Sequence, residues 1–135
     1  MNVEAMEAAR IMAKRGVQLE IIDPRTISPL DIEPMVKSVA KTGHLIVADY
    51  DWINCGFGAE IAAQISQRCF GKLKTPITRL GFAPTPCPCT RPLEDAYYPN
   101  AIDIIRNVEK KLDLSITDLS GETFYTYENK FKGPF

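Results

Sequence analysis

A short stretch of uninterrupted apolar residues, residues 45–48, constrains the fold of this chain more than any other feature. Successive side chains of a strand point to opposite faces of its sheet, so a strand here would be apolar on both faces. Strands of this kind occur in parallel sheets that helices cover on both sides. The stretch therefore predicts an α/β domain with a buried parallel sheet.

Helical and strand-like patterns alternate along the rest of the chain. Apolar residues recur with helical spacing at residues 3–15, 31–42, 56–70 and 100–112, and residues 17–22 and 77–82 have the pattern of strands. Prolines and two cysteines crowd residues 83–92, where we expect a loop without regular structure. This order favours a three-layer, Rossmann-like fold with a mainly parallel sheet, helices on both faces and right-handed crossovers.

Two expectations concern the ends of the chain. The first pattern is helical, whereas a doubly wound unit normally begins with a strand, so we expect an N-terminal strand before Met1 or supplied in another way. Residues 1–112 are predicted to form the domain. Residues 113–135 are polar with scattered aromatic residues and no clear period. They are predicted to form an extended C-terminal arm, either loosely ordered or laid across a neighbouring surface.

Composition excludes several classes of protein. A chain of 135 residues with 45% hydrophobic residues and a net charge of -1 suffices for one domain with its own core. No run of lysine or arginine could neutralise a row of phosphates, so nucleic acid is not an expected partner. No stretch resembles a membrane span or a secretory signal, so no membrane partner is expected. The predicted location is cytoplasmic, or the mitochondrial matrix in a eukaryote.

Four segments carry a resemblance to a known family. They are the sequence IIDPRTISPLD at residues 21–31, LIVAD at residues 45–49, GFGAEI at residues 56–61 and PLEDAYYP at residues 92–99. In this order and spacing they resemble the C-terminal domain of transketolase-type enzymes. The form of the first and last segments is most similar to the beta subunit of the E1 component of 2-oxoacid dehydrogenases, such as those for pyruvate or branched-chain substrates.

The resemblance implies a role within a larger enzyme. Members of the family decarboxylate a 2-oxo acid with thiamine diphosphate and Mg, and pass the acyl group to a lipoyl carrier. The cofactor lies between two other domains, so we expect no catalytic residue, cofactor or metal ligand in this domain. The implied partners are the rest of the E1 beta subunit, the E1 alpha subunit and the E2 acyltransferase core, with a dimer as the assembly.

Two other interpretations stay open at this point. Related C-terminal domains occur in transketolase and deoxyxylulose phosphate synthase, which are transferases. A free-standing α/β module that binds a protein or a small anion would have a similar pattern. For the anion, the glycine-led helix start at residues 56–59 offers free N–H groups, although Glu60 in its first turn would repel negative charge.

Two groups of residues and two further acids are candidates for an interface. One group places aromatic rings beside acids at a strand end, where the rings either anchor a partner or pack in the core: Asp49, Asp51, Trp52 and Phe57. Charged residues also cluster at the end of the first predicted strand, where Arg25 either holds its loop by bidentate bonds or contacts another subunit. The full set of interface candidates is Asp23, Arg25, Asp31, Asp49, Trp52, Phe57, Glu60 and Glu94.

The single histidine and the cysteines have less specific patterns. His44 lies between a helix and a strand and is expected to bond a backbone carbonyl, since no orienting partner for catalysis is evident. Cys87 and Cys89 could bind a metal, form a redox pair or remain plain loop thiols. Their spacing favours the last.

Overall fold

The computed structural model describes residues 1–124, with the side chain of Arg91 left out. It contains five helices and two strands over these residues. They are α1 (Asn2–Ala13), α2 (Glu33–Thr42), β1 (Ile46–Trp52), α3 (Phe57–Arg68), β2 (Thr78–Phe82), α4 (Arg91–Tyr97) and α5 (Ala101–Leu112). None of the described helices has the length and apolar character needed to cross a bilayer.

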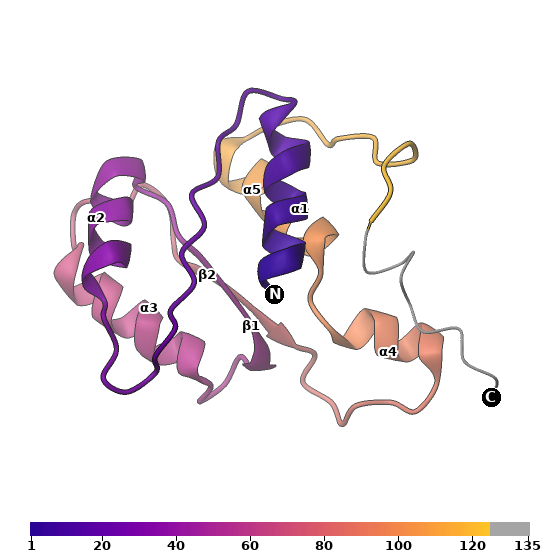
Figure 1. Cartoon of the computed structure of the whole chain (residues 1–135), viewed down its shortest axis with the longest axis horizontal. Coiled ribbons are helices and arrows are strands. Elements are labelled where there is room, and N and C mark those ends of the chain that lie inside the picture. The colour runs from indigo at the N-terminus through magenta and orange to yellow at the C-terminus, as the bar shows by residue number, and fades with distance from the viewer. Residues whose placement is uncertain (125–135) are drawn as a thin grey trace.

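The two strands form a parallel sheet between two pairs of helices. β1 pairs with β2 in the register Ile46 to Thr78 and Val47 to Arg79. Figure 1 shows α2 and α3 on one side of the sheet and α1 and α5 on the other. Ile46 packs against the core beside α1 and α5, and Val47 against the core beside α2 and α3. The predicted parallel strand with two apolar faces is therefore confirmed.

Each helix pair has its own apolar core. The core between α1 and α5 consists of Ala8, Ile11, Met12, Ala101, Ile104, Ile105, Val108 and Phe124. The core between α2 and α3 consists of Ile32, Met35, Val39, Ile61, Ile65 and Cys69. These positions recur with helical spacing because one face of each helix turns towards the sheet.

The start of α5 is held by two side chains from different parts of the chain. Asn100 forms a capping box with Asp103, as its N-cap position predicts. The backbone N–H of Ala101 donates to Oε2 of Glu4 at 2.7 Å, and Glu4 is buried. A carboxylate at this position also faces the positive end of the helix dipole, which offsets part of the cost of its burial.

The predicted strand at residues 17–22 is not formed. Side chains in this segment still alternate, with Val17 and Leu19 packed against the α1–α5 core and Ile22 against the α2–α3 core. However, the described residues provide no backbone-to-backbone hydrogen bond for residues 18–31. A strand requires a neighbour for its backbone groups, and the side-chain pattern does not supply one.

The irregular loop predicted at residues 83–92 is shorter than expected, because a helix begins before its end. Residues 83–90 contain no helix or strand, but α4 begins at Arg91 and runs through most of the segment at residues 92–99. Pro92 lies in the first turn of α4, where its missing N–H has no helical partner to lose. The prolines therefore end the loop by starting a helix.

The part of the C-terminal arm that the structure describes contains no helix or strand. Residues 114–124 cross the α1–α5 side of the domain, where Leu114 and Leu119 pack against its core and Phe124 is buried in it. The remaining aromatic residues of the predicted arm lie outside the described residues: Tyr125, Tyr127, Phe131 and Phe135. The division of the chain at residue 112 stays a prediction.

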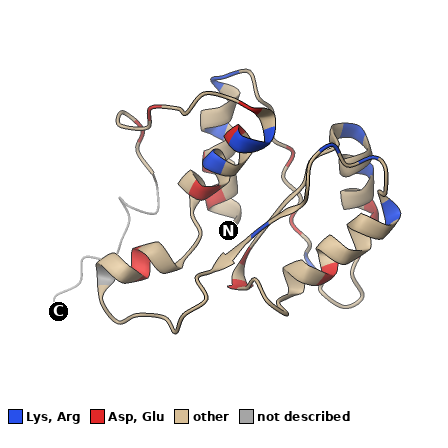
Figure 2. Cartoon of the chain, turned by 180° about the vertical axis from the view of Figure 1, so that it is seen from behind, with Lys and Arg blue, Asp and Glu red and all other residues tan. Residues whose placement is uncertain are grey.

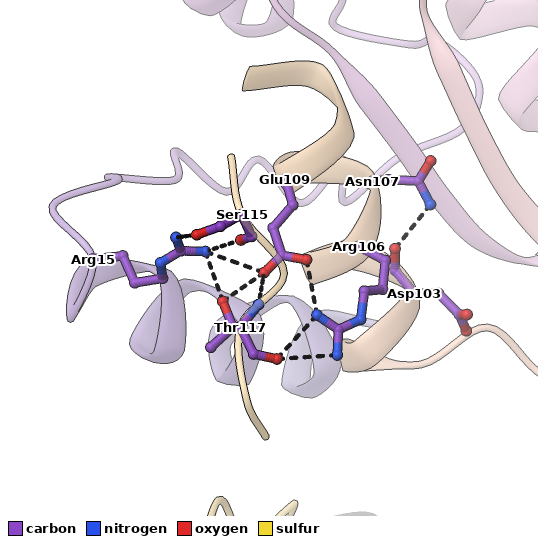
Figure 3. Close-up of polar contacts among 7 residues, drawn as sticks. All are labelled: Arg15, Asp103, Arg106, Asn107, Glu109, Ser115 and Thr117. Carbon is purple, nitrogen blue, oxygen red and sulfur yellow. Dashed lines mark hydrogen bonds and ion pairs between the residues drawn. The ribbon is translucent and has the colours of Figure 1, made fainter. Parts of the chain in front are cut away.

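The buried carboxylate of Glu109 holds this arm against the domain through hydrogen bonds (Figure 3). Glu109 on α5 accepts hydrogen bonds from the backbone N–H of Thr117 at 2.7 Å and from Nη1 of Arg106 at 2.9 Å. Arg15, just after α1, donates to the same carboxylate at 3.2 Å and to the carbonyl of Ser115 at 2.7 Å. Glu109 thus connects the arm to both helices of one layer.

This carboxylate predicts a loss of stability in acid. Burial by itself would raise the pKa of Glu109, but hydrogen bonds from Thr117 and Arg106 outweigh it and keep the pKa below the ordinary value of 4.5. A group with a lowered pKa in the folded state stabilises the fold above its ordinary pKa, and this stability is lost as the pH falls through the lowered value. Urea unfolding should therefore show a falling free energy of unfolding below pH 4.5.

The variant Glu109→Gln tests the source of this pH dependence. It removes the titrating group, so its free energy of unfolding should fall less steeply with acid than that of the unaltered chain. Contacts of Lys14 and Arg10 lower the pKa of Glu122, so part of the slope should remain. Identical slopes for the two proteins would assign the acid sensitivity to other groups.

Candidate functional site

Five aromatic side chains meet at the carboxyl ends of the two strands, and we call them the aromatic surface. They are Tyr50, Trp52, Phe82, Tyr97 and Tyr98. The rings of Phe82 and Tyr97 stack with centroids 4.9 Å apart, and Tyr98 meets Phe82 edge-on at 5.3 Å. Parallel strands end at the same edge of a sheet, which is why β1, β2 and the following α4 bring these residues together.

The aromatic surface is only partly covered. The exposed fractions are 46% for Trp52, 43% for Tyr50 and 36% for Tyr98, whereas Tyr97 is buried beneath them. Rings of this size are costly to leave in water, and clusters of exposed aromatic residues are typical of binding surfaces. Trp52 is therefore not a core residue, and its role as a partner anchor stays a prediction.

The phenols of this surface are neutral. Burial raises the pKa of Tyr50 and Tyr97, and a hydrogen bond with the Cys87 thiol, whose Sγ lies 3.7 Å from Oη of Tyr98, raises the pKa of Tyr98. All three keep their protons at physiological pH. They offer a flat apolar ring with a polar tip, which suits contact with a protein surface.

Acidic residues border the aromatic surface. Figure 2 shows acidic positions on α4 and near the start of α3, on the side where the strands end. Glu94, a predicted interface residue, is exposed on the first turn of α4. Asp49 is half-buried on β1, and Glu60 is exposed in the first turn of α3.

Asp51 closes the predicted anion site at the start of α3. Its Oδ2 accepts a hydrogen bond from the backbone N–H of Phe57 at 3.1 Å, and its Oδ1 accepts one from the N–H of Trp52 at 2.7 Å. Gly56 allows this approach, because a Cβ there would lie 1.9 Å from the carbonyl oxygen of Trp52. The chain's own carboxylate thus takes the position that a phosphate would need.

Replacing Asp51 with alanine should lower the free energy of unfolding by about 1 kcal/mol, the usual loss for a side chain that caps a helix. Urea denaturation measures this change. Asp49→Ala is the matched control, because Asp49 lies on the same strand and has no hydrogen bond among the described side chains. Equal losses in the two variants would contradict the capping role of Asp51.

The other predicted interface residues lie away from the aromatic surface. Asp23, Arg25 and Asp31 are exposed in the connection before α2. Asp31 accepts a hydrogen bond from the N–H of Glu33 at 3.2 Å. Within residues 1–124 Arg25 forms no ion pair, so the structure does not support its role as a loop pin. Phe57 packs against the α2–α3 core, as its alternative interpretation predicts.

The histidine and the cysteines occupy separate places. Nδ1 of His44 lies 3.0 Å from the hydroxyl of Thr75, so the expected backbone carbonyl is not its partner. Burial, with the nearby charges of Lys74 and Lys111, lowers the pKa of His44 and keeps the ring neutral. All four cysteines are free thiols. No group of three His, Cys, Asp or Glu side chains in the described part of the chain is arranged to hold a metal ion.

A parallel sheet between two helix layers, ending in an aromatic surface, defines a Rossmann-like α/β domain (Figure 1). The chain belongs to the family described as "Transketolase, C-terminal domain", whose profile matches residues 1–104. The resemblance predicted from four sequence segments is thereby confirmed.

Similar proteins are beta subunits of larger enzymes. The chain is 41% identical over 108 residues to the acetoin:2,6-dichlorophenolindophenol oxidoreductase subunit beta of Cupriavidus necator, covering 80% of this chain and 32% of that protein. It is 39% identical over 111 residues to the mitochondrial pyruvate dehydrogenase E1 component subunit beta of Ascaris suum, covering 82% of this chain and 31% of that protein. The Mus musculus counterpart is 41% identical over 110 residues, with 81% and 31% covered. The chain therefore spans about a third of the length of these relatives.

Proposed function

We propose that this chain acts as the C-terminal domain of the E1 beta subunit of a thiamine-diphosphate-dependent 2-oxoacid dehydrogenase. The names of its relatives, beta subunits of pyruvate and acetoin enzymes, support this assignment. Such an enzyme would work in the cytoplasm of a bacterium or in the mitochondrial matrix of a eukaryote.

The start of α3, the one anion site that the sequence suggested, does not fit the diphosphate of thiamine diphosphate. A diphosphate needs free N–H groups and positive charge, but the carboxylate of Asp51 occupies the glycine-led start of α3. In the described part of the chain, no three His, Cys, Asp or Glu side chains converge as a metal cage would require. In this proposal the domain contributes contacts, and the chemistry belongs to other parts of the enzyme.

The aromatic surface is the observation that supports the contact role. Tyr50, Trp52 and Tyr98 together offer a neutral, partly exposed apolar area bordered by acids. Interfaces between proteins combine an aromatic centre with a polar rim, and the centre loses its water on binding. The proposed partners are the rest of the beta subunit, the E1 alpha subunit and the E2 acyltransferase core, within a dimeric assembly.

The test replaces Trp52 and Tyr98 with alanine in the full-length beta subunit that carries this domain, produced together with its E1 alpha subunit. Loss of two aromatic anchors should weaken assembly by on the order of a hundredfold, seen as dissociation in sedimentation at low concentration. Phe70→Ala is the control, because Phe70 is 90% exposed beyond the end of α3, away from the aromatic surface. Unchanged assembly of the double variant would refute the contact role.

A separate assay tests the enzyme class. The assembled protein is supplied with thiamine diphosphate, Mg and an artificial electron acceptor, and is offered pyruvate, a branched-chain 2-oxo acid, acetoin or a pair of sugar phosphates in turn. Turnover of one of the first three substrates is the expected result. A protein that turns over only sugar phosphates would belong to the transketolase alternative.

A further inference from the structure

We propose that residues 125–135 of this chain bind its own aromatic surface and compete there with the partner of the proposed function. The competition rests on the proposed function, whereas the binding does not. The binding is supported by the place where the described arm ends, by the spacing of the aromatic residues that follow, and by the charges of the segment and of the surface.

The arm approaches the aromatic surface at the start of α5. Phe124 is buried in the same core cluster as Ala101, the first residue of α5. Tyr98 precedes Ala101 by three residues, so their Cα atoms lie at most about 11 Å apart. Figure 1 shows the described chain ending on the side of the α1–α5 layer where α4 lies. Residues 125–135 therefore begin close to the aromatic surface, and an extended chain of this length reaches about 36 Å.

The aromatic residues of this segment fall on one face of an extended chain. Residues 113–135 as a whole have no clear period, but the last four rings all occupy odd positions and the charged residues all occupy even positions. Side chains of an extended backbone alternate between two faces, so one face would be aromatic and the other charged. The rings are Tyr125, Tyr127, Phe131 and Phe135, and the charged residues are Glu128, Lys130 and Lys132.

The spacing of the rings in the aromatic surface suits such a face. The ring centroids of Tyr50 and Tyr98 lie 5.7 Å apart, and those of Trp52 and Phe82 lie 6.1 Å apart. Alternate residues of an extended chain lie about 6.6–6.8 Å apart, so successive rings of the segment can contact successive rings of the surface. Edge-on and offset contacts of this kind are the arrangements that aromatic pairs prefer.

The segment and the border of the surface have complementary charges. Lys130 and Lys132 flank Phe131, and Glu128 is the only acid of the segment. The surface is bordered by acids, among them Glu94, which is exposed on α4. Lysine has a long apolar stem, so its ammonium group can turn to an acid at the border while the neighbouring ring lies on the surface.

The covalent connection favours this occupant over a free protein. A segment joined to its site by a short linker acts at an effective concentration of about 1 mM, so contacts too weak to hold a free peptide suffice. A partner protein binds only the uncovered form of the surface. Its apparent affinity is therefore reduced by the fraction of molecules in which the surface is free.

The fluorescence of Trp52 tests the binding, because Trp52 is the single tryptophan of the chain. Replacing the four rings of the segment should raise acrylamide quenching of Trp52 about threefold and shift its emission to longer wavelength, because its ring returns to water. The control variant changes four other positions of the segment, keeps every ring and charge, and should leave the quenching unchanged. The ring variant is Tyr125→Ser, Tyr127→Ser, Phe131→Ser and Phe135→Ser, and the control is Thr126→Ser, Asn129→Ser, Gly133→Ser and Pro134→Ser.

Two results would overturn the binding. One is equal quenching of Trp52 in the unaltered chain and in the ring variant. The other is quenching in the unaltered chain that falls as the chain is concentrated, because a second copy would then be the occupant. Quenching that rises in the ring variant alone, at every concentration of the chain, is the expected result.

The full-length beta subunit that carries this domain tests the competition. With the four ring substitutions it should assemble with its E1 alpha subunit about tenfold more tightly than the unaltered subunit, measured by sedimentation. Unchanged or weaker assembly would overturn the competition. Failure of the proposed function is seen separately: the variant Trp52→Ala with Tyr98→Ala would then assemble normally, while the quenching of Trp52 in the chain would still report the bound segment.

Discussion

Replacing Glu109 with alanine is expected to lower the free energy of unfolding by about 3 kcal/mol, which is typical of breaking a buried ion pair from one side. Glu109 is only 2% exposed and accepts bonds from Arg15, Arg106 and Thr117. Without the carboxylate the two guanidinium groups lose a shared partner, and the N–H of Thr117 is left without an acceptor. The arm after α5 should detach first.

Urea denaturation measures this loss, and hydrogen exchange at Thr117 reports the detachment of the arm. The matched control is Glu33→Ala, because the pair of Glu33 with Arg68 at 2.6 Å is exposed, with 60% and 47% of the side chains in water. Exposed pairs contribute about 0–1 kcal/mol. A loss for Glu109→Ala no greater than that of the control would refute the importance of the buried carboxylate.

Replacing Ile105 with alanine is expected to cost about 3 kcal/mol of stability through the cavity that it leaves. Ile105 is fully buried in the α1–α5 core, where Ile11 and Met12 of α1 pack in the same cluster. Rigid helices cannot close the space, so neighbouring side chains lose contacts in addition to the transfer free energy of the removed atoms.

The same substitution at Ile116 is the control. Ile116 is 78% exposed, so Ile116→Ala should change the free energy of unfolding by no more than about 0.5 kcal/mol. Thermal and urea unfolding of both variants provide the comparison. If Ile105→Ala were as mild as the control, the α1–α5 core would not be close-packed around this residue.

Much of the fold could be predicted because side-chain patterns report burial directly. The apolar residues 45–48 predicted a strand between two layers, and Ile46 and Val47 indeed contact opposite cores. The helical spacing at residues 100–112 and the cap at Asn100 predicted α5. Each of these signals depends on residues within a few positions of one another.

The features that the sequence did not reveal depended on partners elsewhere in the chain. Residues 17–22 have the side-chain pattern of a strand but no backbone neighbour. Asp51 and Gly56 form a cap that fills the anion site considered as an alternative, because the turn between them brings a carboxylate to the helix start. The aromatic surface joins Tyr50 to Tyr98, with ring centroids 5.7 Å apart across a long separation in sequence.

The amino-acid sequence by itself determined both strands and every described helix except α4, the parallel sheet with two apolar faces, and the family. Only the tertiary structure decided which polar groups pair, such as Glu109 with Arg15, and which rings share a surface, such as Phe82 and Tyr97. The physical reason is the distance along the sequence over which each feature is determined. Burial repeats with the period of a helix or strand and is visible locally, whereas a hydrogen bond or ring contact needs two groups that chain topology brings together.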